Sequence, residues 1–156
     1  MTVEGSALSV LQLADIVLGC TAESMEEAIE FVGKRLVERG SVNEAYIDGM
    51  KQRETVMSTY LGNGVALPHG VLESKDHIIQ TGITVAQYPD GVDWQQGTAR
   101  IVVGLAAVGE DHVAVLSQLA NVLQDEDLCE LFATTDDATL IHTYLTASDE
   151  DEEDEE

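Results

Sequence analysis

Basic residues are scarce in this chain: seven lysines and arginines stand against 30 acidic residues, giving a net charge of −23. A surface this acidic repels phosphate backbones and anionic lipids, so we expect neither nucleic acid nor an anionic membrane as a partner. The last eight residues contribute −8, and the remaining −15 is spread along the chain. Such acidity with little lysine is typical of a halophilic protein, because molar salt screens self-repulsion. The alternative is an ordinary acidic protein with an acidic partner-binding tail.

Long apolar runs and paired cysteines are also missing. No window approaches 18 uninterrupted apolar residues, which argues against a membrane-spanning helix. The first ten residues lack a basic region and include Glu4, so we expect no secretory signal. Cys20 and Cys129 are too far apart in sequence to form a CxxC or zinc-like pattern. Reduced thiols and a cytoplasmic location are the resulting predictions.

The element pattern predicts one α/β domain over residues 1–147 and a disordered acidic tail over 148–156. Ser24 and Glu27 fit a capping box that opens a helix ending at Gly40, and a second helix is expected from about Asn43 to Val56. Short strands are expected at 65–67, 83–87 and 101–108, with "YPDGVDW" (88–94) as a turn. Three further helices are expected near 110–123, 128–132 and 138–145. Helices interleaved with strands indicate two or three layers.

His69 has the most unusual local setting of the four histidines. The apolar run Val65–Leu67 reads as a buried strand that Pro68 ends, and Gly70 frees the backbone after the histidine. This pattern places the imidazole at a strand end, where ligand chemistry gathers in open α/β sheets. The alternative is a turn histidine that only hydrogen-bonds a neighbouring carbonyl.

Other candidates carry less information. The histidines lack metal-binding spacing, so we expect neither a metal nor another cofactor. "GCTAES" around Cys20 resembles a phosphate-accepting loop, but Glu23 and Glu26 would repel phosphate, so a small, partly buried thiol is predicted. Arg53 could compensate an anion at His69, or it could form an ordinary salt bridge with a neighbouring carboxylate, Glu54 or Asp48. The pair Asn63 and Gly64 is compatible with any tight turn, so it is weak evidence for a phosphate-binding loop.

Together these residues resemble a known family. "RETVMSTYLGNGVALPHG" (53–70) is similar to the active-site signature of mannitol/fructose-class enzyme IIA domains of the phosphoenolpyruvate-dependent sugar phosphotransferase system. The segments "AQYPDGVDW" (86–94) and "IVVGLAAVGEDHVAVLSQLANVL" (101–123) match as well, so the resemblance covers about residues 10–147. It implies a central mixed β-sheet flanked by α-helices.

The resemblance further implies a phosphoryl relay. His69 would be phosphorylated by the carrier HPr, with His112 stabilising the phosphoryl group and Arg53 compensating its charge. Asn63, Gly64, Pro68 and Gly70 would support the loop. The group would pass to a cysteine of enzyme IIB and on to sugar at the membrane component IIC. The family implies attack by Nε2, with a backbone carbonyl expected to hold the other ring nitrogen.

Two other functions remain open. A nitrogen-regulatory enzyme IIA shares the Pro-His-Gly motif and would act in signalling, whereas a non-catalytic interaction module would use the acidic tail. Within the sugar branch we expect fructose rather than mannitol, because of the halophilic composition and the stand-alone form of the domain. A monomer is the expected oligomeric state, and transfer and stability are expected to rise with salt.

Overall fold

A mixed five-stranded sheet lies at the centre of the computed structural model, which describes residues 10–70, 76–94, 96–107 and 109–146. The strands, in chain order, are β1 (Ile16–Val17), β2 (Tyr60–Gly62), β3 (Val65–Ala66), β4 (Gly82–Asp93) and β5 (Thr98–Ala106). Their spatial order is β1-β4-β5-β3-β2. Strands β1 and β4 pair in parallel, as do β3 and β5, whereas the β4–β5 and β2–β3 pairs are antiparallel. The expected central mixed sheet is therefore confirmed.

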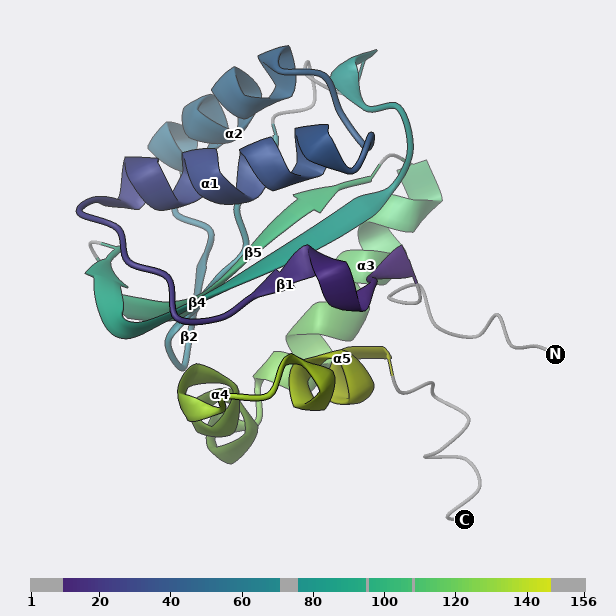
Figure 1. Ribbon diagram of the computed structural model, residues 1–156. Helices are drawn as coiled ribbons and strands as arrows, with labels where there is room; N and C mark the ends of the chain where they lie inside the picture. Colours follow the sequence, from purple (N-terminus) through teal and green to yellow (C-terminus); the bar gives the residue numbers. More distant parts are fainter. Residues whose placement is uncertain (1–9, 71–75, 95, 108, 147–156) are drawn as a thin grey trace, which may run out of the picture.

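Helices cover both faces of the sheet, which makes three layers (Figure 1). Helices α1 (Met25–Glu38) and α2 (Ala45–Val56) lie on one face. Helices α3 (Gly109–Leu123), α4 (Glu126–Thr134) and α5 (Ala138–Thr146) lie on the other. In the described ranges, no helix combines the length and the apolar character needed to cross a membrane.

The alternation of side chains along the strands builds two separate cores. On β5, Ile101, Val103 and Leu105 point to the α3–α5 side, and Val102 and Ala106 point to the α1–α2 side. All five are buried. Because both faces are packed, the central strands read as nearly continuous apolar runs rather than as alternating ones.

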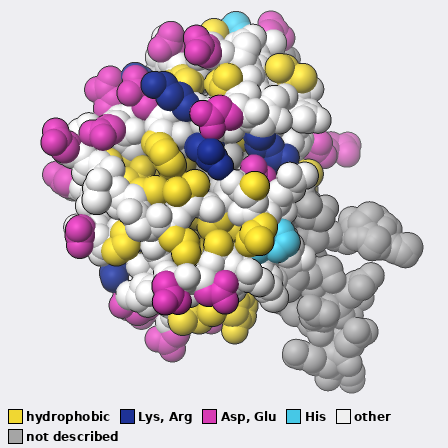
Figure 2. Space-filling view, in the orientation of Figure 1, with side chains coloured by type: hydrophobic (Ala, Val, Ile, Leu, Met, Phe, Trp, Pro, Cys, Tyr) yellow, Lys and Arg dark blue, Asp and Glu magenta, His cyan; other side chains and the backbone are white. Residues whose placement is uncertain are grey.

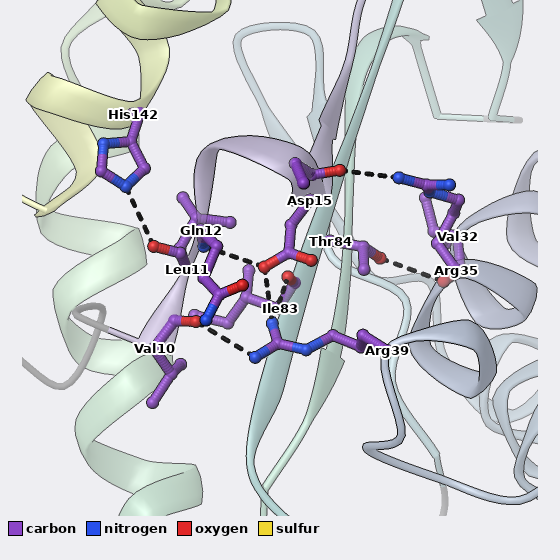
Figure 3. A network of polar contacts seen from close by, with 11 residues as sticks. Val10, Leu11, Gln12, Asp15, Val32, Arg35, Arg39, Ile83, Thr84 and His142 are labelled. Atoms are coloured by element: carbon purple, nitrogen blue, oxygen red, sulfur yellow. Dashed lines mark hydrogen bonds and ion pairs between the residues drawn. The ribbon is translucent and has the colours of Figure 1, made fainter.

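The N-terminal part of the described chain is held down by buried polar contacts (Figure 3). Arg39, at the end of α1, donates to the Asp15 carboxylate at 2.7 Å and to the carbonyls of Val10 and Ile83. On the opposite side, the His142 ring of α5 lies 3.0 Å from the Leu11 carbonyl. The segment before β1 is thereby fixed between α1, β4 and α5.

The structure corrects one expected element and adds two. Residues 88–93, which were expected to lie in a turn over 88–94, form the end of strand β4, because a register shift between Gln87 and Val92 absorbs Pro89 and the left-handed Gly91. The short strands β1 and β2 were not expected. The five helices were expected, and the N-cap of α1 is confirmed because Ser24 Oγ accepts the Glu27 N–H. Residues 148–156, the expected disordered tail, lie outside the described residues.

The surface is strongly acidic where the structure describes it. Figure 2 shows Asp and Glu side chains spread over the visible face around a few Lys and Arg side chains. Several Lys and Arg side chains form ion pairs, for example Lys51 with Glu26 and Glu30, which links α2 to α1. The seven Lys and Arg residues, paired or not, leave a net charge of −23.

Candidate functional site

The His69 ring has one nitrogen fixed by the backbone. His69 follows strand β3 and Pro68, and a parallel bridge pairs it with Leu105 of β5. Its Nδ1 lies 2.8 Å from the Leu67 carbonyl oxygen. Since a carbonyl can only accept, Nδ1 carries the proton and Nε2 keeps a free lone pair. The expected carbonyl partner is therefore present, and the geometry identifies Nε2 as the available nucleophile.

His112 and Arg53 approach His69 from two different helices. The His112 ring, in the first turn of α3, stands edge-on to that of His69, with centroids 5.4 Å apart and an interplanar angle of 63°. Arg53 lies in the last turn of α2, and in the described part of the chain it pairs with neither Glu54 nor Asp48. Instead it donates to the Met57 carbonyl. Of the two alternatives for Arg53, the salt bridge with Glu54 or Asp48 is therefore not formed among the described residues. The His112 ring contacts the His69 ring, and the charge of Arg53 acts on it.

The environment of His69 favours the neutral ring. Burial is the largest influence and lowers the pKa of His69 below its usual range. Hydrogen bonding to the Leu67 carbonyl raises this pKa, the charges of Arg53 and His112 lower it, and Glu54 raises it. The net result is a neutral imidazole near pH 7, the form with a lone pair for nucleophilic attack.

The loop-supporting residues divide into two groups. Pro68 and Gly70 flank His69: the Pro68 carbonyl accepts the Leu105 N–H at 3.0 Å, and the Gly70 N–H donates to the Tyr46 hydroxyl at 2.9 Å. Asn63 and Gly64 form the two-residue β2–β3 hairpin turn, where both have positive φ.

That hairpin lies away from the histidines. The Asn63 amide donates to the carbonyls of Leu123 and Gln124, at the opposite end of α3 from His112. Because α3 runs from Gly109 to Leu123, the turn lies about 15 Å along the helix from the His112 end. Asn63 and Gly64 therefore support strand β3 and not the surroundings of the His69 ring.

The sequence analysis missed two residues that hold the site. Tyr46 was not among the candidate residues, yet its hydroxyl donates to the Leu105 carbonyl and accepts from the Gly70 N–H. Burial raises the pKa of Tyr46 to about 12, so the hydroxyl stays protonated and can donate. Glu54 was considered only as a salt-bridge partner, although it is 8% exposed. One buried face of α2 carries residues spaced four apart, namely Tyr46, Met50 and Glu54. A carboxylate on this otherwise buried face is the sequence signal that could have pointed to Glu54.

The arrangement supplies a nucleophile and groups suited to an anion, without an evident metal site. Among the described residues, no three His, Cys, Asp or Glu side chains are grouped so as to hold a metal ion. A neutral imidazole with an available Nε2 lone pair, a second imidazole and an arginine suit transfer of a charged group such as phosphoryl.

Two relatives are similar in sequence to most of this chain. The mannitol-specific EIICBA component of Pasteurella multocida is 43% identical over 142 residues, which are 88% of this chain and 23% of that protein. The mannitol-specific phosphotransferase enzyme IIA component of Staphylococcus aureus is 44% identical over 113 residues, 72% of this chain and 78% of that protein. The chain thus spans less than a quarter of the length of the EIICBA relative.

Solved structures agree with the fold. Mannitol IIA from Escherichia coli has a TM-score of 0.81 and 39% identity, with 86% of this chain and 97% of that one covered. The complex of enzyme IIA and phosphorylated enzyme IIB for mannitol from Escherichia coli contains a chain with a TM-score of 0.80 and 38% identity, at the same coverage. The nitrogen regulatory protein IIA-Ntr of Neisseria meningitidis has a TM-score of 0.77 and 26% identity, with 89% and 98% covered.

The family follows from the sequence as a whole. The model of the phosphoenolpyruvate-dependent sugar phosphotransferase system EIIA 2 family matches residues 9–148. This range holds the complete sheet, all five described helices and the His69 site. The chain therefore belongs to the EIIA 2 family of the phosphoenolpyruvate-dependent sugar phosphotransferase system and is a phosphotransferase component.

Proposed function

We propose that this domain carries a phosphoryl group on His69 Nε2, which it accepts from phosphorylated HPr and passes to a cysteine of enzyme IIB. The observation that carries the proposal is the contact between His69 Nδ1 and the Leu67 carbonyl, which leaves Nε2 as the free nucleophile. Membership of the EIIA 2 family supplies the reaction class. The Escherichia coli complex with phosphorylated enzyme IIB supports the choice of acceptor.

Each of the two transfer steps forms one bond to phosphorus and breaks another. The Nε2 lone pair forms a bond to phosphorus while the bond between phosphorus and the donor histidine breaks. Because Nδ1 keeps its proton, the phosphorylated ring takes up positive charge, which the Leu67 carbonyl stabilises. The enzyme IIB thiolate then attacks phosphorus, the Nε2–P bond breaks, and the ring returns to its neutral form.

His112 and Arg53 are proposed to stabilise the phosphoryl group during transfer. His112 can donate a hydrogen bond to a phosphoryl oxygen, and its place in the first turn of α3 puts the free N–H groups of that turn nearby. Arg53 can offset charge on the equatorial oxygens. Positioning and electrostatics therefore account for the catalysis, and no metal is required.

Exposed apolar side chains around the site suit the docking of protein partners. Val56 and Met57 follow Arg53 and are 77% and 66% exposed, and Val113, next to His112, is 64% exposed. Apolar contact can bring HPr and enzyme IIB close to an otherwise acidic domain. A halophilic setting, which would screen the remaining repulsion, stays a prediction.

Mannitol is the proposed sugar, in place of the expected fructose. Both relatives described above are mannitol-specific. The sugar would be bound by the membrane component IIC, so the assignment rests on these relatives and not on a residue of the site. The nitrogen-regulatory alternative is less well supported, because the identity to IIA-Ntr is 26% against 39% for mannitol IIA.

The proposal is tested by running the relay on the full chain. We expect incubation with labelled phosphoenolpyruvate, enzyme I and HPr to leave one acid-labile phosphoryl group per chain, which mass spectrometry locates on His69. Adding a mannitol-type enzyme IIB should remove the label, and a fructose-type enzyme IIB should remove it more slowly. Label on another residue, or none, would refute the carrier role.

Replacing His112 should slow transfer without harming the fold. We expect His112→Ala to lower the rate of phosphorylation by phospho-HPr about 100-fold, the usual cost of removing one donor to a developing anion. The melting temperature should change little because the ring is only partly buried. Ser117→Ala, an exposed position on the same helix, is the matched control and should transfer at the wild-type rate. A large drop in melting temperature for His112→Ala would indicate a structural role.

A further inference from the structure

Glu54 is a buried carboxylate that accepts three hydrogen bonds. One oxygen accepts the Thr59 N–H at 2.8 Å and the Trp94 indole N–H at 2.9 Å. The other oxygen accepts the Thr59 hydroxyl at 2.7 Å. Burying a carboxylate is costly even when it is hydrogen-bonded, so an acidic residue at this position calls for a reason beyond stability.

A short series of hydrogen bonds leads from Glu54 to His69. Glu54 holds Thr59, whose carbonyl accepts the Leu67 N–H at 3.1 Å. The Leu67 carbonyl in turn accepts from His69 Nδ1. The position of Thr59 therefore sets the position of the carbonyl that orients the His69 ring. The other side of the loop is held separately, by the Tyr46 hydroxyl at Gly70.

We propose that Glu54 is a positioning residue for phosphoryl transfer at His69. By fixing Thr59, and through it Leu67, Glu54 holds the ring with Nδ1–H inward and Nε2 outward. Its negative charge also offsets the positive charge that the ring takes up on phosphorylation. The inference rests on the proposed carrier function, which it deepens by adding a residue that touches neither the phosphoryl group nor a partner.

The charges around His69 fit this role. The groups that influence the ring are Arg53 and Glu54 on α2 and His112 on α3, together with the Tyr46 hydroxyl that holds the loop at Gly70. Arg53 and His112 disfavour a positively charged ring, as burial does, and Glu54 favours it. A phosphorylated ring with Nδ1–H resembles imidazolium, so the same influence acts on it.

Glutamine at position 54 separates charge from hydrogen bonding. Its amide oxygen can accept both N–H groups, and its NH₂ can donate to the Thr59 hydroxyl, which is able to accept. We expect Glu54→Gln to keep a melting temperature near that of the wild type. Phosphorylation by phospho-HPr should be about tenfold slower, and ¹⁵N NMR of the ring should show His69 titrating at lower pH. Asp48→Asn removes one exposed charge from the same helix and should match the wild type in both measurements.

A second variant tests the hydrogen bonds while the charge remains. Thr59→Val removes one of the three hydrogen bonds to Glu54 and should slow transfer about threefold, with the His69 titration unchanged. A wild-type transfer rate in Thr59→Val would overturn the positioning role. An unchanged His69 titration in Glu54→Gln would overturn the role of the charge.

Failure of the carrier proposal and failure of the Glu54 proposal can be told apart. If the wild-type chain takes up no phosphoryl group on His69, the carrier function is wrong. The NMR titration of Glu54→Gln needs no phosphoryl donor, so it still reports whether Glu54 acts on the His69 ring. If the wild type is phosphorylated and Glu54→Gln behaves identically in rate and titration, only the inference about Glu54 is wrong.

Discussion

His69→Ala should take up no phosphoryl group from phospho-HPr, whatever the incubation time. The nucleophilic Nε2 is removed, and His112 cannot replace it, because no carbonyl contact like that of Leu67 with His69 Nδ1 fixes its tautomer in the described structure. Acid-labile label per chain, measured by filter binding and by intact mass, should therefore fall from about one to background.

The variant is expected to fold normally. Loss of one hydrogen bond at a half-buried ring costs about 1 kcal/mol, which lowers the melting temperature of a chain of this size by roughly 2–4 °C. His77→Ala, which replaces a histidine outside the site, is the matched control and should still accept one phosphoryl group. Stoichiometric label on folded His69→Ala would move the acceptor elsewhere and would remove the basis for the roles given to His112 and Glu54.

The fold was predictable wherever local signals are strong. The Ser24–Glu27 pattern and the apolar spacing after it predict α1, because capping and periodicity are properties of neighbouring residues. Strand β1 has only two residues, Ile16 and Val17, too few for any periodicity to be visible. The continuation of β4 through residues 88–93 depends on pairing with β5, which compensates for turn-forming residues.

The site was predictable in part for the same reason. Pro68 and Gly70 mark His69 locally, and the family resemblance brought in Arg53 and His112. The supporting contacts join residues far apart in sequence: Glu54 meets Trp94 40 positions later, and Tyr46 meets Leu105 59 positions later. Spacing cannot reveal such pairs, because they depend on how α2 packs against the sheet.

A large loss of stability is expected on replacing Arg39. Arg39→Met should lower the free energy of unfolding by about 3–5 kcal/mol, because it leaves the Asp15 carboxylate buried without its ion-pair partner. The two side chains are 16% and 8% exposed, so water cannot replace the lost contact. The carbonyls of Val10 and Ile83 lose a donor as well. Urea unfolding followed by circular dichroism measures the change.

The comparison with an exposed pair makes the cause of that loss identifiable. Arg100 and Glu130 form an ion pair of 3.0 Å whose side chains are 31% and 65% exposed, so Arg100→Met should cost no more than about 1 kcal/mol. If the buried charge is the cause, Asp15→Asn combined with Arg39→Met should recover part of the stability that Arg39→Met loses, because the uncompensated carboxylate is gone. Equal losses for Arg39→Met and Arg100→Met would mean that the segment before β1 is not held by this pair.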